Sequence, residues 1–286
     1  MNKDLRALYG LKYSPFSPDV PVEALVCAPA VDDFGWRVEY GLAQEGGFAM
    51  ITGDVGQGKS VSLRLIEDRL ERMRDVTVGA LVHPQSNLAD FYRELGDLFG
   101  VTLRPHNRWA GFRSLRERWV AHIESTLMRA VLLVDEAQDM APPVLNELRI
   151  LTSTHFDSRS ILGVVLAGDQ RLPDKLQRDD LLPLGSRIRS RLRVETASVD
   201  DLRACLTHRM KVAGNAKLMT KELVDTLCEH ALGNYRLLLN MAAELLAVAA
   251  RRELAQLDEK LYLEVFAAGD KVAPEGKSRR STRRRR

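Results

Sequence analysis

The stretch that decides the fold is Gly53-Asp54-Val55-Gly56-Gln57-Gly58-Lys59-Ser60, a complete G-x-x-x-x-G-K-S phosphate-binding loop. An apolar, strand-like run at 48–51 precedes it, and a helical pattern follows it from 61 to 73. Glycines allow successive backbone N–H groups to converge on a polyphosphate, and the helix amino terminus adds positive potential. An ordinary glycine-rich turn is the alternative, and the strand–loop–helix context argues against it.

This loop predicts the chemistry of a nucleotide site. We expect Lys59 to reach the β- and γ-phosphates of ATP, and Ser60 to hold Mg²⁺. The predicted nucleotide-binding residues are Gly53, Asp54, Val55, Gly56, Gln57, Gly58, Lys59, Ser60 and Val61.

A second motif completes the predicted site. Val131-Leu132-Leu133-Val134-Asp135-Glu136 is an apolar strand that ends in two acids, the Walker-B pattern. We expect Asp135 to hold Mg²⁺ through water, and Glu136 to accept a proton from the attacking water or to orient it. A buried strand that ends in an acidic turn is the alternative.

Polar residues in three further stretches fit the same chemistry. The strand predicted at 161–167 ends before Asp169, our first choice for a residue that senses the γ-phosphate, and Gln170, our second. The arginine-rich stretch 185–193 offers Arg187, and after it Arg191, as a guanidinium supplied to a neighbouring subunit. Arg236 begins a helix and could reach the nucleotide. The alternatives are a simple turn, a solvated basic strand edge and a surface arginine.

Composition indicates a soluble globular protein. The chain has 286 residues, 45% hydrophobic and 28% charged, and no run approaches the roughly 18 apolar residues of a membrane span. The amino terminus lacks the apolar core of a signal peptide. Cys27, Cys205 and Cys228 fit no metal spacing. We therefore predict a cytoplasmic protein with reduced thiols and no membrane partner.

Positive charge is concentrated at the carboxyl end. Residues 271–286 hold eight Lys and Arg and one Glu, a net charge of +7, whereas the whole chain carries +3. The body, residues 1–270, is therefore slightly acidic at −4. Such a segment cannot bury apolar surface, so we expect a disordered arm that binds a polyanion, most plausibly nucleic acid. A solubilising tail is the alternative.

A second basic stretch lies before the Walker-B strand. Its members are basic or aromatic and fall in a loop that leads into a helix: Arg104, His106, Arg108, Trp109, Arg113, Arg116 and Arg118. These side chains could follow DNA phosphates without reading bases. Glu117 and Glu124 lie among them, so a solvated, salt-bridged helix face is the alternative.

The order of elements predicts an α/β domain followed by helices. Strands and helices alternate up to about 197, which is typical of a parallel sheet with helices on both faces. Predicted strands are 48–52, 76–82, 131–134, 161–167 and 192–196; predicted helices are 32–45, 59–73, 88–99, 111–128 and 143–152. Predicted helices of the second domain are 200–212, 221–231, 235–252 and 256–266. We expect four parts: an extended segment packed on the core (1–30), the nucleotide-binding domain (31–197), a small all-α domain (198–270) and the tail (271–286).

The sequence of motifs resembles that of AAA+ ATPases with a P-loop core and an all-α lid. Within that class it is similar to the ExeA/GspA-like ATPases. The matching stretches are Tyr9-Gly10-Leu11-Lys12-Tyr13-Ser14-Pro15-Phe16, Glu45-Gly46-Gly47-Phe48, Asp135-Glu136-Ala137-Gln138, Val165-Leu166-Ala167-Gly168-Asp169-Gln170 and Gly233-Asn234-Tyr235-Arg236. That family usually has Gln where this chain has Asp169.

This resemblance implies one leading function and two alternatives. Stand-alone members of the family resemble the transposition helpers IstB, TniB, TnsC and MuB, which implies ATP-dependent assembly of a homo-oligomer, a ring or helical filament, on double-stranded DNA. The implied protein partner is a DDE-type transposase. A secretion or envelope-assembly ATPase is the first alternative. A non-enzymatic nucleotide switch is the second, and Lys59, Asp135 and Glu136 argue against it.

Overall fold

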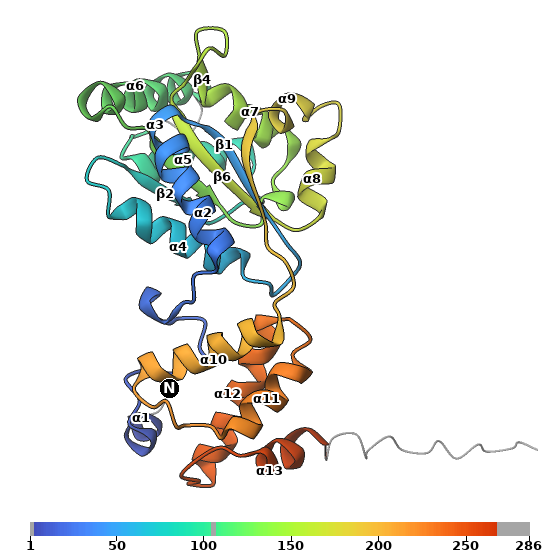
Figure 1. The fold of residues 1–286 in the computed structure, drawn as a ribbon. Coiled ribbons are helices and arrows are strands. Elements are labelled where there is room, and N and C mark those ends of the chain that lie inside the picture. Colours follow the sequence, from blue (N-terminus) through green and yellow to red (C-terminus); the bar gives the residue numbers. More distant parts are fainter. Residues whose placement is uncertain (1–2, 104–106, 268–286) are drawn as a thin grey trace, which may run out of the picture.

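The computed structural model describes residues 3–103 and 107–267. Figure 1 shows an α/β domain above a smaller bundle of helices. The tail at 271–286, Arg104 and His106 lie outside the described residues, so the predictions made for them remain predictions.

A five-stranded parallel sheet forms the centre of the larger domain. Its strand order is β2-β3-β6-β1-β7, with the bounds β1 Gly47–Thr52, β2 Val78–Leu81, β3 Ala130–Val134, β6 Leu162–Gly168 and β7 Ile188–Arg193. Every residue of β1, β3 and β6 is buried, which agrees with their continuous apolar sequences. Because β1, β6 and β3 are neighbours, the loops after them meet at one edge of the sheet. The predicted fold class is confirmed.

Helices cover both faces of the sheet (Figure 1). One face packs against α2 (Pro29–Arg37), its π-helical continuation η2 (Val38–Leu42) and α4 (Lys59–Glu71). The other packs against α5 (Leu88–Phe99), α6 (Arg108–Thr126) and α7 (Pro142–Leu151). The helix predicted at 32–45 is therefore three consecutive pieces, the last being α3 (Ala43–Glu45).

The smaller domain is helical, as predicted. Its helices are α10 (Val199–Ala213), α11 (Lys221–His230), α12 (Tyr235–Arg251), α13 (Glu259–Tyr262) and the π-helical η4 (Leu263–Ala267). Ser198 begins α10 with a capping box: its hydroxyl accepts from the Asp201 N–H at 3.1 Å, and the Asp201 carboxylate accepts from the Ser198 N–H at 2.9 Å. This cap satisfies backbone N–H groups at the first turn of the helical domain.

The amino-terminal segment differs from its prediction in one respect: it contains a helix, α1 (Lys3–Tyr9), where an extended chain was expected. Tyr9, Leu11 and Phe16 are buried in the core of the helical domain. The prolines at 15–29 favour an extended chain, whereas the Lys, Leu, Arg and Ala residues before them favour a helix. The segment 10–28 then runs back between the two domains, apart from one 3₁₀ turn at Val22–Ala24.

The last strand also differs from its prediction. It was expected at 192–196, and β7 instead covers Ile188–Arg193 at the edge of the sheet. An edge strand has a neighbouring strand on one side only, so Arg189, Arg191 and Arg193 face solvent. These charged residues interrupt the apolar run that marks the buried strands. Short elements between β6 and β7 and before β6 were not predicted: the hairpin β4 (Ser153–Thr154) and β5 (Arg159–Ser160), and the helices α8 (Arg171–Leu176) and α9 (Leu182–Gly185).

Candidate nucleotide-binding site

The phosphate-binding loop has the backbone that its glycines predict. Gly56 and Gly58 have φ values of 83° and 107°, in the left-handed region that side chains disfavour. Gly58 is also the residue from which α4 begins. A Cβ atom at Gly56 would lie 2.2 Å from the Asn234 side-chain oxygen, so this position has no room for a side chain.

Two predicted ligands of the metal meet at the start of α4. The Ser60 hydroxyl donates a hydrogen bond of 2.6 Å to the Asp135 carboxylate, which follows β3. Lys59 is buried, and its ammonium donates to the carbonyls of Gly53 at 2.9 Å and Asp54 at 3.0 Å. A hydroxyl and a carboxylate are hard oxygen donors, the type that Mg²⁺ prefers, and Mg²⁺ takes its other ligands from water and phosphate. The donor set therefore fits this ion.

Glu136 lies beside this pair in a constrained conformation. Its φ is 50°, unusual for a residue with a side chain, and such values concentrate at functional sites. The Gln138 amide donates to the Glu136 carboxylate at 2.6 Å. The same Gln138 amide, through its oxygen, accepts from the Asp169 backbone N–H at 3.2 Å. Gln138 is buried and links the proposed base to the tip of β6, a role that sequence reasoning missed.

The side chain of Asp169 is bound within this chain. Its carboxylate accepts from the Arg171 guanidinium at 2.7 and 2.9 Å. That hydrogen bond, followed by the positive charges of Arg171 and Lys59, lowers the pKa of Asp169 despite its partial burial. Gln170, the second choice, is exposed where α8 begins. Of Asp169 and Gln170, Asp169 is therefore the one that Gln138 connects to Glu136.

Arg187 is at the opposite end of the sheet from the loop of its own chain. Ile188, the next residue, pairs with Phe48 near the start of β1, whereas the loop follows Thr52 at the end. The Arg187 guanidinium donates to the Asp157 carboxylate and to the Pro183 carbonyl. Arg191 is exposed and donates to the Gly185 carbonyl at 3.4 Å. Neither arginine is brought to this chain's own site.

The helical domain touches the phosphate-binding loop directly. The Asn234 amide donates to the Val55 carbonyl at 3.0 Å, and its oxygen caps α12 by accepting from the Leu237 N–H at 3.1 Å. The Arg236 backbone N–H donates to the Gly56 carbonyl at 3.4 Å. Arg236 lines the same cavity as Lys59 and Glu136, so the structure brings it to the predicted site.

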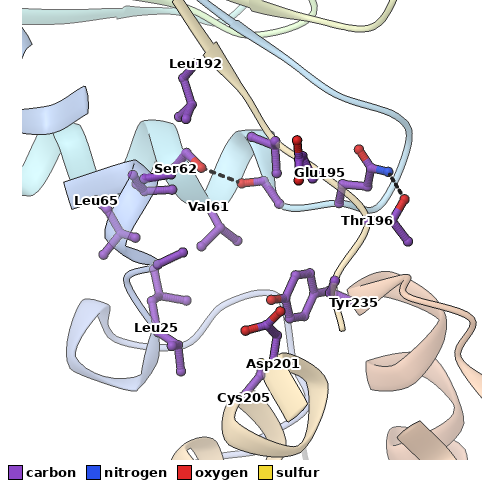
Figure 2. A pocket seen from close by; sticks show the side chains of 18 of the residues that line it. Leu25, Val61, Ser62, Leu65, Leu192, Glu195, Thr196, Asp201, Cys205 and Tyr235 are labelled. Atoms are coloured by element: carbon purple, nitrogen blue, oxygen red, sulfur yellow. Dashed lines mark hydrogen bonds between the residues drawn. The ribbon is translucent and has the colours of Figure 1, made fainter. Parts of the chain in front are cut away.

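Two adjoining cavities follow the loop on its lid side. One, of about 360 Å³, is lined by the phosphate-binding residues together with Glu136 and Arg236. The other, of about 460 Å³, lies between the amino-terminal segment, the end of β7 and the lid. Tyr235 lines the larger cavity, and Figure 2 shows its ring beside Asp201. Their combined size suits a small-molecule ligand, with an anionic group at the loop and an apolar group beyond it.

Tyr235 and Gln57 were not recognised as site residues of this kind from the sequence. Burial, and then the neighbouring Cys205 and Asp201, raise the pKa of Tyr235 to about 12, so its phenol is neutral at physiological pH. Gln57 accepts from the Asp54 N–H at 2.7 Å. It also donates to the Thr196 hydroxyl at 3.0 Å, the dashed line that ends at Thr196 in Figure 2. Gln57 was predicted only as a member of the loop, and its contact with the interdomain linker has no sequence signal.

Four arginines of the second basic stretch have partners within the chain. Arg108 donates to Glu147 at 3.0 Å and Arg113 to Glu117 at 2.7 Å. Arg116 donates to the Ile150 carbonyl at 3.0 Å, and Arg118 to the Phe99 carbonyl at 3.4 Å. Trp109 is 73% exposed and stacks on Phe112 at 5.6 Å. These contacts agree with the salt-bridged face that the sequence left open as the alternative.

Comparison with known proteins agrees with this fold. Residues 42–176 match the family described as "AAA domain". The α/β fold is that of the AAA+ ATPases. The chain is 30% identical over 247 residues to "General secretion pathway protein A" of Aeromonas hydrophila, a match that covers 85% of this chain and 44% of that relative. The chain thus spans less than half the length of this curated relative.

Solved structures give the same fold. The Aeropyrum pernix ORC2 protein superposes with a TM-score of 0.72 at 16% identity, covering 92% of this chain and 73% of that one. A structure of Drosophila ORC bound to DNA gives a TM-score of 0.67 at 18% identity, covering 92% of this chain and 65% of that one. At these identities the likeness concerns the fold alone. Over residues 3–103 and 107–267, no helix combines the length and apolarity needed to cross a membrane.

Proposed function

We propose that this chain binds ATP with Mg²⁺ in the two adjoining cavities and hydrolyses it with Glu136 as the base. The observation that carries this proposal is the 2.6 Å contact between Ser60 and Asp135, which lies beside Lys59 and Glu136. Chain segments 75 residues apart are needed to make that contact. The same arrangement of a hydroxyl, an acid and a lysine is used to hold a metal-bound polyphosphate.

Each residue of the site has a separate role in the proposed mechanism. A bound Mg²⁺ supplies neutralisation of the phosphate charges. Lys59 adds positive charge at the β- and γ-phosphates, while Glu136 orients the attacking water and accepts its proton. Gln138 donates to the Glu136 carboxylate and accepts from the backbone N–H of Asp169. A movement at the tip of β6 would therefore change the position of the Glu136 carboxylate. Arg236 approaches the same cavity from the lid.

Arg187 is proposed to complete the site of a neighbouring subunit. Its position at the far end of the sheet means that its own loop is out of reach. A guanidinium contributed by another copy can neutralise charge on the transferring phosphoryl group. In a homo-oligomer, Arg187 would exchange its contacts with Asp157 and Pro183 for that phosphoryl group.

Substitution Glu136→Gln tests the catalytic assignment. It should leave ATP binding within about twofold of the parent, while turnover falls by at least about 100-fold because the proton acceptor is lost. Binding is measured by titration calorimetry and turnover by phosphate release. Unchanged turnover would show that another group activates the water, and the assignment of Glu136 would be withdrawn.

We further propose that the ATP-loaded protein assembles on double-stranded DNA in the cytoplasm and recruits a DDE-type transposase. Two observations support DNA as a partner. The segment 271–286 carries a net charge of +7, and the chain shares its fold with proteins whose structures are described as complexes with DNA. The transposase is proposed from the resemblance to transposition helpers.

Sedimentation with DNA tests this second proposal. In the presence of ATP, the Glu136→Gln variant should pellet only when DNA is added. Deletion of 271–286 should weaken this DNA binding and reduce its salt dependence. A salt slope unaltered by the deletion would exclude the tail as a DNA arm. Failure of the full chain to pellet with DNA would overturn the proposal.

A secretion function is the second candidate because of the Aeromonas hydrophila relative. In that case the ATPase domain would act on envelope components through parts of the relative that this match does not include. Absence of any DNA effect on ATP turnover, together with an isolated complex containing secretion proteins, would favour this candidate over the DNA-bound assembly.

A further inference from the structure

Arg209, on α10 of the lid, is a buried cation for which the described residues provide no carboxylate partner. Its side chain belongs to a residue only 4% exposed. One terminal nitrogen donates to the carbonyls of Pro15 and Ser17, both at 3.2 Å, and its Nε has no hydrogen-bond partner among the described residues. Burying a cation without a counter-charge is unfavourable, so the site favours an added anion.

The charges around Arg209 strengthen that preference. Burial lowers the pKa of Arg209, the Cys205 thiol and the Tyr13 phenol oppose this shift, and the nearby cation Arg64 adds to it. Arg64 also donates to carbonyls of the amino-terminal segment, those of Pro18 at 3.1 Å and Val20 at 2.6 Å. Two arginines therefore bind carbonyl groups of the segment 15–20, whose Phe16 and Val20 side chains are also buried.

Arg209 is placed where the two cavities of the nucleotide site meet. It lines both of them, as do Gly58, Val61, Tyr235 and Leu239. The smaller cavity is lined by Lys59, proposed to bind the β- and γ-phosphates, and by Ser60, proposed to hold Mg²⁺. A nucleotide that extends from the smaller cavity into the larger one passes this shared wall with its ribose and α-phosphate.

We propose that Arg209 is a nucleotide-positioning residue that donates to the α-phosphate of both ATP and ADP. This inference rests on the proposed nucleotide site and goes beyond it, because it assigns a phosphate contact to the lid that is independent of the γ-phosphate. Since the same guanidinium holds the carbonyls of Pro15 and Ser17, a bound nucleotide also fixes the segment 15–20. ATP and ADP then both tie that segment to the lid, and only the γ-phosphate contacts distinguish the two ligands.

The binding of three ligands distinguishes this role from a structural one. Titration calorimetry measures the affinity of ATP, ADP and adenosine for the parent and for Arg209→Met, with Mg²⁺ present. The variant should lose at least about tenfold in affinity for both ATP and ADP, by the same factor, because a charge-assisted hydrogen bond to a group common to both is removed. Adenosine, which has no phosphate, should bind equally to both proteins.

Matched variants separate the effects. Arg203→Met removes an arginine from the same helix that pairs with Asp200 and Asp225, outside both cavities, and should change none of the three affinities. Arg236→Met should weaken ATP more than ADP. Thermal unfolding without nucleotide reports whether Arg209→Met folds. If it does not, Arg209→Lys, which keeps a charge at a shorter reach, should show the same equal losses for ATP and ADP.

The three affinities support or overturn the assignment of Arg209. Equal losses for ATP and ADP with adenosine unchanged support the inference. A folded Arg209 variant that binds ATP and ADP like the parent overturns it, as does a loss confined to ATP or an equal loss for adenosine. A parent that binds neither nucleotide overturns the proposed function as well, so the two failures are distinguishable.

Discussion

Gln57 joins the phosphate-binding loop to the start of the lid through both ends of one amide. It accepts from the Asp54 N–H and donates to the Thr196 hydroxyl, and it is buried. Gln57→Ala should therefore lower the free energy of unfolding by about 1–3 kcal/mol, since buried donors and acceptors lose their partners. Urea unfolding at equilibrium measures this change.

A surface glutamine supplies the control for that measurement. Gln85→Ala removes an exposed amide that donates to Asp139 over a long 3.5 Å. It should change the free energy of unfolding by less than about 0.5 kcal/mol. Equal effects of the two substitutions would mean that the Gln57 amide does not stabilise the loop.

The three thiols should differ sharply in reactivity. Cys27 is exposed, whereas Cys205 and Cys228 are buried. Burial raises the pKa of Cys228 to about 11, so little of it is thiolate at pH 8. A thiol reagent at pH 8 should find one fast cysteine in the native protein and three after unfolding, and Cys27→Ser should remove the fast phase. Two fast thiols in the native protein would contradict this burial pattern.

At the scale of elements, the amino-terminal segment should contribute to the free energy of unfolding of the lid. Phe16 is 3% exposed within the lid core, although about 190 residues separate it from α10. Phe16→Ala should cost about 3–5 kcal/mol of unfolding free energy, because it leaves a cavity that the lid helices cannot fill. Leu8→Ala, on the 45% exposed face of α1, should cost far less. A small effect at Phe16 would place the segment outside the folded core.

Elements were predictable where one physical signal dominated. The buried strands β1, β3 and β6 were predicted to within one residue, and α5 at 88–99 has the predicted bounds. Continuous apolar runs and regular apolar spacing depend only on local sequence. The edge strand β7 and the hairpin β4–β5 were missed because exposed arginines and short pairings carry no such period.

For the whole molecule, the central prediction is that active sites are shared between copies. Arg187→Ala should lower ATP turnover by about 100-fold or more, because a neighbouring site loses its guanidinium. Mixing this variant with Glu136→Gln should restore part of the activity, since each Glu136→Gln copy supplies an intact Arg187 to a site with an intact base. Phosphate release at a fixed total concentration measures the recovery.

Asp157→Ala is the control for this mixing experiment. It removes the internal partner of Arg187 but keeps the arginine, so turnover should be retained. If a mixture of Arg187→Ala and Glu136→Gln recovers no ATP turnover, Arg187 acts within its own chain or only in folding.

The candidate site was predictable from the sequence only in its local parts. Lys59, Ser60, Asp135 and Glu136 stand at fixed offsets within two motifs, so their types and spacing indicated their roles. Asn234, Gln57 and Arg209 form contacts between residues more than 100 positions apart, the first two between the domains and the third with the amino-terminal segment. Such contacts depend on how the domains pack, and no local pattern records them.

The joining of Tyr9, Leu11 and Phe16 to the helices α10–α13 also sets a timetable for synthesis. At about 5–20 residues per second, the first of these residues leaves the ribosome tens of seconds before its partners exist. The larger cavity beside the loop is lined in part by Tyr235 and Leu239 of α12, so it is complete only after α12 has emerged. The proposed nucleotide site of a nascent chain is therefore finished before α13 is made.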